Sequence, residues 1–230
     1  MYKHISFDFW RTLAISNSKF SELRLLYLQE NYLKNIDIKT IDNVIEKVGD
    51  EVDEINMGKG ISLPSIDMYS MVFKNLDQSI NKPQLKKIIE DIDVIFLENP
   101  PKLYSKEIPN ILDELKSQKF TMNISSNTAY IKGNMLKKAM RLLKIHDYFS
   151  FFVFSDEINH SKPSNHFFKS VTENCHNIGI FSDQIIHIGD NYRADIQGAN
   201  KSNIKSLLVN SNNVSIREGL CQENILQHTI

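Results

Sequence analysis

The segment "ISFDFWRTLAIS", residues 5–16, determines how the rest of the chain is interpreted. Its first residues are mostly apolar, as in a buried β-strand, and Asp8 stands where that run ends. Thr12 follows four residues later, which is typical of a site at which an aspartate accepts a phosphoryl group. Such a site requires a second acid two residues after the aspartate, but this chain has Trp10 there. The segment therefore predicts an aspartate-based site with an altered second position.

The composition is that of a folded chain with a large core, and it excludes several classes of partner. With 230 residues and 41% apolar content, the chain can form one large domain or a core domain with a smaller one. The net charge is -1 and no long basic run occurs, so we expect no nucleic-acid partner. No apolar run approaches the roughly 18 residues of a membrane span, so we expect no membrane association. Cys175 and Cys221 show neither metal-ligand spacing nor a disulfide framework, which favours a cytoplasmic location.

Short apolar or β-rich runs recur along the chain and predict the strands of one sheet. There are five such runs, at residues 4–9, 120–125, 149–156, 184–190 and 205–209. From the second run onward they are separated by segments with helical periodicity, such as "IPNILDELKSQK" and "NMLKKAMRLLKI". Strands that alternate with helices indicate a doubly wound α/β fold, in which helices cover both faces of a parallel sheet.

The first and second predicted strands are separated by about ninety residues that read as helices. Amphipathic segments such as "FSELRLLYLQENYL" and "QLKKIIEDIDVIFLEN" fill this interval, and an unstructured loop of that length would be unusual. We therefore expect an inserted helical cap over residues 15–100, whose end is marked by the prolines of "NPPKLYSKEIP". The α/β core would consist of residues 1–14 and 101–230.

Polar residues follow four of the predicted strands, at the edge where an open parallel sheet binds its ligands. They are Asp8 after the first strand, Ser126 and Asn127 after the second, Lys162 after the third, and Asp190 and Asp195 after the fourth. Each is an ordinary cap or turn residue when taken alone. Their joint order and placement predict a single site.

In this order, the segments "FDFWRTL", "NISSNT", "SKPSNHFF" and "HIGDNYRAD" resemble the four signatures of the haloacid dehalogenase-like (HAD) hydrolase superfamily. They extend over nearly the whole predicted core. The helical interval after the first segment is similar to the cap inserted at that point in one large subgroup. The resemblance implies a Rossmann-like core with an α-helical cap, and a hydrolase that acts through a covalent aspartyl intermediate.

The resemblance also implies a role for each polar residue. Asp8 would be the nucleophile, and Mg²⁺ would be held by the carboxylates of Asp8 and Asp190 and by the main-chain carbonyl of Trp10. Asp195 would support the metal site through water or by holding Lys162. Three carboxylates in one crevice would otherwise raise each other's pKa values, which also favours a bound cation.

The substrate would be a small phosphorylated metabolite in the phosphatases of this family. Ser126 would donate a hydrogen bond to a phosphoryl oxygen, and Lys162 would neutralise the developing charge. Asn127 would shape the loop or hydrogen-bond the ligand. Trp10 would be either a core aromatic under the cap or a flat wall for the substrate, and Arg11, where the family has glycine, would add a cation beside it.

Trp10 leaves three explanations open, because an indole can neither protonate a leaving group nor activate water. The first is a Mg²⁺-dependent phosphatase or phosphotransferase of low or unusual activity, with a cap residue such as Glu22, Arg24 or Tyr27 activating water. The second is a metal-free 2-haloacid dehalogenase, in which Lys39 stands near the expected position of the halide-binding arginine. The third is a regulatory protein that binds a phosphorylated ligand or a metal without turnover. The sequence does not indicate an oligomeric state.

Overall fold

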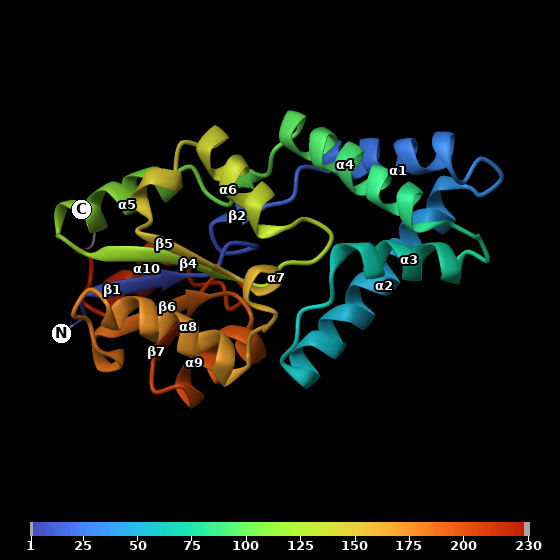
Figure 1. Ribbon diagram of the computed structural model, residues 1–230. Helices are drawn as coiled ribbons and strands as arrows, with labels where there is room; N and C mark the ends of the chain where they lie inside the picture. The colour runs from blue at the N-terminus through green and yellow to red at the C-terminus, as the bar shows by residue number, and fades with distance from the viewer. Residues whose placement is uncertain (1, 228–230) are drawn as a thin grey trace.

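A five-stranded parallel sheet forms the centre of the computed structural model, which describes residues 2–227. In spatial order its strands are β5 (Phe151–Phe154), β4 (Thr121–Ser126), β1 (His4–Phe7), β6 (Ile185–Gly189) and β7 (Lys205–Leu208). Each corresponds to one of the five runs predicted as strands. Because β1 lies between β4 and β6, the residues that follow these three strands come together at one edge of the sheet (Figure 1).

Helices cover both faces of this sheet, as predicted for a doubly wound fold. Figure 1 shows α5 (Ile108–Ser117) and α6 (Gly133–Leu142) above the sheet, and α8 (Asn165–His176) and α9 (Gly198–Lys201) below it. Two further helices of the core are α7 (Ser155–Ile158), directly after β5, and α10 (Ile216–Gln222) near the end of the chain. Helix α8 buries Phe167, Phe168, Val171 and Cys175, whose spacing places them on one face toward the sheet.

The predicted cap consists of four helices between β1 and β4. They are α1 (Ser18–Asn31), α2 (Ile38–Lys59), α3 (Ser65–Asn75) and α4 (Lys82–Glu98). Asp37 caps the first turn of α2, and Asn81 forms a capping box with Gln84 at the start of α4. Each helix has a polar face, and within residues 2–227 none is long and apolar enough to cross a membrane. The division at residues 14/15 and 100/101 stays a prediction.

A two-stranded ribbon joins the cap to the core. β2 (Ala14–Ile15), where the chain leaves the core, pairs antiparallel with β3 (Lys102–Leu103), where it returns. The side chain of Asn17 adds a hydrogen bond to the carbonyl of Pro100, with 3.1 Å between Nδ2 and O. The sequence predicted only that prolines end the cap. The ribbon itself was missed because each strand has only two residues, too few for a detectable alternation.

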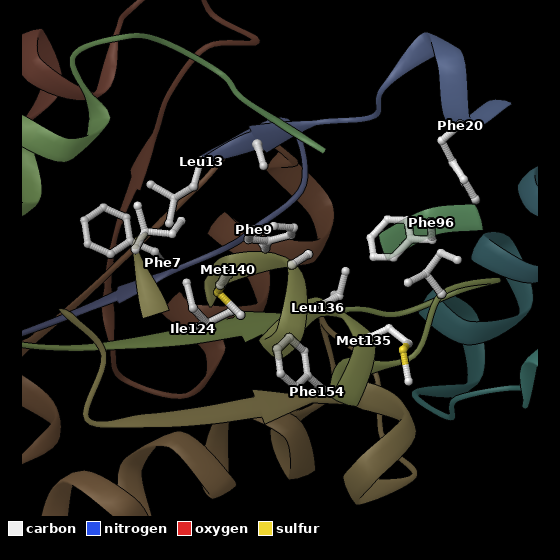
Figure 2. Packing of buried hydrophobic residues seen from close by; sticks show 14 of the residues in the cluster. Phe7, Phe9, Leu13, Phe20, Phe96, Ile124, Met135, Leu136, Met140 and Phe154 are labelled. Carbon is white, nitrogen blue, oxygen red and sulfur yellow. The ribbon is translucent and has the colours of Figure 1, made fainter. Parts of the chain in front are cut away.

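Buried apolar side chains continue from the core into the cap as one cluster. Figure 2 shows Phe9 and Leu136 of the core on one side of this cluster, and Phe20 of α1 and Phe96 of α4 on the other. The rings of Phe20 and Phe96 meet edge to face, with 5.2 Å between their centroids. Burial of an aromatic side chain of this kind contributes about 1.5–3 kcal/mol, so these contacts help hold the cap over the core.

Candidate active site

Asp8 lies just beyond the end of β1, and only 6% of its surface is exposed. Its main-chain N–H continues the strand pairing by donating to the carbonyl of Ile188 at 2.8 Å. Its Oδ1 accepts hydrogen bonds from Ser126 Oγ at 3.0 Å and from Lys162 Nζ at 2.7 Å. Its Oδ2 accepts a hydrogen bond from Thr12 Oγ1 at 3.2 Å. The structure thus brings together Asp8, Ser126 and Lys162 from three separate segments, as predicted.

The buried floor of the site is formed by Asp8, Lys162 and Asp195, and Lys162 is 2% exposed. Its Nζ lies 2.7 Å from Asp8 Oδ1 and 2.6 Å from Asp195 Oδ1. Burial opposes the charge on Lys162, but the carboxylates of Asp195 and Asp8 outweigh this and raise its pKa. Asn127 holds the backbone, because its Oδ1 accepts from Lys162 N at 2.7 Å and its Nδ2 donates to Lys162 O at 3.1 Å. Asn127 therefore positions the loop that carries Lys162.

Asp195 is enclosed by protein donors. Its Oδ1 accepts from Lys162 Nζ at 2.6 Å and from His187 Nε2 at 3.0 Å, and its Oδ2 accepts from Asn191 N at 2.9 Å. Burial alone would raise the pKa of Asp195, but the nearby charge of Lys162 and the hydrogen bond from His187 outweigh burial and lower this pKa. Gly189 permits this approach, since a Cβ there would lie 2.2 Å from Asp195 Cγ. Asp195 thus holds Lys162 and has few free lone pairs.

A line of buried polar side chains extends from the floor across one face of the sheet. Ser6 Oγ lies 3.0 Å from His187 Nδ1 and donates to Ser125 Oγ at 2.8 Å, and Ser125 Oγ also accepts from Asn123 Nδ2 at 2.7 Å. Asn123 Oδ1 lies 2.8 Å from His4 Nε2, and burial lowers the pKa of His4 to about 4. We missed this line, although the alternation of polar and apolar residues before Asp8 signals it.

Asp190 completes an acidic cluster with Asp8 and Asp195, and one oxygen of each lies within 4.8 Å of the others. Within residues 2–227 the Asp190 carboxylate has no hydrogen bond or ion pair. Burial, followed by the charges of Asp8 and Asp195, raises its pKa to about 6. These hard oxygen donors suit Mg²⁺, which would neutralise a carboxylate that the charges of Lys162 and Arg11 stabilise only in part. The predicted approach of Asp8 and Asp190 is confirmed.

The backbone after β6 forms a π-helical turn over Tyr192–Gln197. Asn191 begins this turn, because its Oδ1 accepts from Arg193 N and Ala194 N at 3.0 Å each. The Asp195 N–H donates to the carbonyl of Asn191 at 2.8 Å. Single π-helical turns are frequent at functional sites. Here the turn places Asp195 back against the end of its own strand.

Trp10 and Arg11 form a tight turn at the mouth of the site. Arg11 has a φ of 59°, in the left-handed region that glycine adopts most easily. The turn is held by the bond from Arg11 N to Ala14 O at 2.7 Å and by Asn210 Nδ2, which donates to Arg11 O at 2.8 Å. Trp10 is half-buried and packs edge to face on Phe9, with 5.1 Å between ring centroids. Both Trp10 and Arg11 line a cavity that also contains Asp8 and Lys162 in its lining.

A cavity of about 260 Å³ lies above this floor. Its core lining comprises Asp8, Trp10, Arg11, Ser126, Asn127, Thr128, Ala129, Lys162, Asp190, Asn191, Ala194 and Asp195. All the predicted site residues therefore face one space. The cap contributes Asp53 and Met57, both from α2. The sequence did not identify these two, and its cap candidates Glu22, Arg24 and Tyr27 do not line the cavity.

Comparison with known proteins agrees with this architecture. A family model described as haloacid dehalogenase-like hydrolase matches residues 33–209, well over half of the chain. A glyceraldehyde 3-phosphate phosphatase from Methanothermobacter thermautotrophicus is 29% identical over 119 residues, which cover 52% of this chain and 50% of that protein. The chain thus matches about half the length of this curated relative.

Two solved structures illustrate the shared fold. A HAD-hydrolase from Bacillus subtilis bound to magnesium has a TM-score of 0.76 and 17% identity, and the match covers 99% of both chains. A 2-haloacid dehalogenase from Pseudomonas syringae has a TM-score of 0.64 and 16% identity, covering 94% of this chain and 89% of that one. These two likenesses show the shared fold, and the family match, the four signatures and the capped sheet establish that this chain belongs to the haloacid dehalogenase-like hydrolases.

Proposed function

We propose that the protein is a Mg²⁺-dependent phosphatase or phosphotransferase that acts on a small phosphorylated metabolite through Asp8. One observation carries the proposal: the oxygens of Asp8 and Asp190 lie within 4.8 Å of each other, beside a charged lysine. Two carboxylates this close to each other suit a shared divalent cation. The similarity to a glyceraldehyde 3-phosphate phosphatase supports the same class of reaction.

The floor can perform the chemistry of a double displacement. An oxygen of Asp8 attacks phosphorus, the bond from phosphorus to the leaving oxygen breaks, and an aspartyl phosphate forms. Water then attacks phosphorus, which releases phosphate and restores the Asp8 carboxylate. Lys162 and Ser126 neutralise and hydrogen-bond the phosphoryl oxygens in both steps. When bound by Asp8 and Asp190, Mg²⁺ reduces the repulsion between the carboxylate and the anionic substrate.

The surroundings of Asp8 restrict the substrate. A cavity of about 260 Å³ favours a small molecule. Trp10 gives this cavity a flat apolar wall, and Arg11 places a cation at its mouth, suited to an anionic group. Because Trp10 cannot protonate a leaving oxygen, we expect acyl and aryl phosphates to react faster than alkyl phosphates.

The metal requirement is tested by a thermal and chemical unfolding titration with Mg²⁺. At about one hundred times its Kd, a ligand that binds only the folded state stabilises it by about 2.7 kcal/mol. We expect this stabilisation in the wild type and its loss in Asp190→Asn. Asp183→Asn is the matched control, because it removes an exposed acid outside the cavity lining and should leave the response intact. No response in the wild type would contradict the proposed metal site.

A substrate panel separates the three functions that the sequence left open. It contains acyl, aryl and alkyl phosphates and 2-haloacids, each with Mg²⁺ and with EDTA. The proposal predicts Mg²⁺-dependent release of phosphate. Release of halide in EDTA would instead identify a dehalogenase. Stabilisation by Mg²⁺ with no turnover of any compound would identify a binding protein.

A further inference from the structure

The core residues that line the cavity include no group that is free to deliver and remove protons. Trp10 occupies the position at which the family has an acid, and an indole N–H does not titrate usefully. Asp8, Lys162 and Asp195 are engaged with one another, and Asp190 belongs to the proposed metal site. The guanidinium of Arg11 stays protonated. Among the described residues that line the cavity, this leaves one further carboxyl group, on Asp53 of the cap.

One stripe of α2 faces the core along the side of the cavity. Ile45, Gly49, Asp53 and Met57 are each four residues apart and therefore lie on the same side of the helix. The carbonyl of Ile45 accepts a hydrogen bond from Tyr130 OH at 2.9 Å. A Cβ on Gly49 would lie 3.9 Å from the Tyr130 ring. Asp53 and Met57 continue this stripe into the cavity itself.

Two further contacts attach α2 to the core beyond Tyr130. Glu54, the neighbour of Asp53, forms an ion pair with Arg193 of the π-helical turn, with 2.9 Å between Oε2 and Nη1. At the end of α2, the carbonyl of Gly60 accepts from Ser161 N at 3.3 Å, one residue before Lys162. Asp53 therefore lies between contacts to the segments that follow β4, β5 and β6. Figure 1 shows α2 extending from the cap toward this edge of the sheet.

The surroundings of Asp53 suit a group that exchanges protons. Its side chain is exposed to solvent and has no hydrogen bond or ion pair in the described part of the chain. Partial enclosure, followed by the carboxylates of Asp50 and Glu54 on the same helix, raises its pKa. The ionisable groups that line the same cavity from the core are Arg11, Lys162 and the acidic cluster, and Tyr130 lies close enough to be influenced by the charge of Asp53. A carboxyl group with a raised pKa is better matched to proton transfer near neutral pH than an ordinary one.

We propose that Asp53 is the general acid and base of this enzyme and acts from the cap in place of the core residue that Trp10 replaces. The proposal rests on the phosphatase function proposed above. In the first step the protonated Asp53 gives its proton to the leaving oxygen as the bond from that oxygen to phosphorus breaks. In the second step the Asp53 carboxylate takes a proton from water as the water oxygen attacks the aspartyl phosphate. The proton lost in the first step is regained in the second.

The test compares Asp53→Asn with Asp53→Glu and with Glu51→Gln, which removes an exposed acid from the same helix outside the cavity lining. Loss of a positioned acid or base reduces rates by about 10²- to 10⁴-fold, and we expect a fall of this size in kcat for alkyl phosphates in Asp53→Asn. Asp53→Glu should recover part of it, and Glu51→Gln should retain wild-type kcat. Since both positions are exposed, thermal unfolding should show that the three variants are folded.

An acid quench with an aryl phosphate separates proton transfer from a merely structural role. The aryl leaving group needs no proton, so Asp53→Asn should form the phosphorylated Asp8 at the wild-type rate and then accumulate it, as measured by mass spectrometry. Equal kcat in Asp53→Asn and Glu51→Gln, without accumulation, would overturn the role of Asp53 alone. Absence of Mg²⁺-dependent turnover in the wild type would overturn the proposed function and, with it, this role.

Discussion

The floor of the cavity differs from its roof, which is the part of α2 that carries Asp53 and Met57. On the floor, Asp8, Lys162 and Asp195 are 6%, 2% and 1% exposed, and each makes at least two polar contacts with protein groups. On the roof, Asp53 is exposed and makes none in the described residues. Buried charges of the floor are fixed in place before substrate arrives, which favours transition-state stabilisation. A group on the roof acts only when the cap brings it to the substrate. The difference predicts that floor substitutions affect folding as well as turnover, whereas roof substitutions affect turnover alone.

The largest effect is expected from Lys162→Met, which tests the floor. The substitution leaves Asp8 and Asp195 buried without their shared cation. Removal of one partner of a buried ion pair destabilises proteins by about 3–5 kcal/mol. We expect a loss of this size in the free energy of unfolding, measured with urea in the absence of Mg²⁺.

Lys137→Met is the control for this substitution. Lys137 pairs with Glu157 at 2.8 Å, but both side chains are about one-third exposed. Such a pair contributes up to about 1 kcal/mol. Equal losses in the two variants would show that burial does not distinguish the floor from the surface.

The next effect is a loss of stability in acid that originates in the polar line beneath the floor. Burial lowers the pKa of His4 to about 4 from its ordinary value of 6.5, and a hydrogen bond with Asn123 only partly opposes this. Between these two values the unfolded chain takes up a proton that the folded chain does not, so stability falls as the pH falls from 6.5 to 4. At 1.36 kcal/mol per pH unit, His4 accounts for a loss of about 3 kcal/mol.

The free energy of unfolding of wild type and of His4→Gln, measured at pH 7 and at pH 4.5, checks this. The variant should lose less stability on acidification than the wild type, even if it is less stable at both pH values. An identical pH dependence in the two proteins would show that His4 is already protonated in the folded state.

A smaller effect is expected at the mouth of the site, where Arg11 belongs to the core and lines the cavity. Its left-handed backbone, with a φ of 59°, is unfavourable by about 1 kcal/mol for residues other than glycine. Arg11→Gly should therefore stabilise the protein by about this amount, while loss of the cation should raise KM for phosphate esters. Arg11→Lys, which keeps both the charge and the strained turn, should do neither. Destabilisation by glycine would indicate that Arg11 contributes to folding.

The smallest effect on folding is expected for Glu54→Gln on the roof. The pair between Glu54 and Arg193 is exposed, so it contributes up to about 1 kcal/mol and is screened by salt. Its loss should leave the unfolding curve nearly unchanged but lower kcat/KM at low salt, because α2 is then held less firmly beside the cavity. Glu51→Gln, an exposed acid on the same helix, serves as control. A large change in unfolding would remove the distinction between roof and floor.

The floor was predictable from the sequence because its residues follow strands. Apolar runs separated by helical segments gave the five strands, and parallel strands place their carboxyl ends at one edge. Asp8, Ser126, Lys162 and Asp190 therefore had to meet. His187 was missed as a partner of Asp195 because a histidine within an apolar strand gives no sign of what lies beside it.

The roof was not predictable in the same way. The periodicity of α2 identifies its buried side, with Ile41, Ile45, Val48 and Val52, but not which part of its acidic exposed side faces the core. That depends on how the cap docks. Gly49 lies beside the ring of Tyr130, one helical turn before Asp53, but it was no signal, because a Cβ there would lie 3.9 Å from that ring and make an ordinary contact.

The ribbon of β2 and β3 also bears on how proteins of this architecture diversify. Paired antiparallel strands lie about 5 Å apart, so the whole helical insertion leaves and re-enters the sheet domain at neighbouring points. Segments whose two ends are this close are readily exchanged or inserted without disturbing the host domain. The four helices can therefore be replaced as one cassette by genetic recombination. Such an exchange would replace every cap residue that lines the cavity in a single event, while the buried residues of the core beneath stay in place.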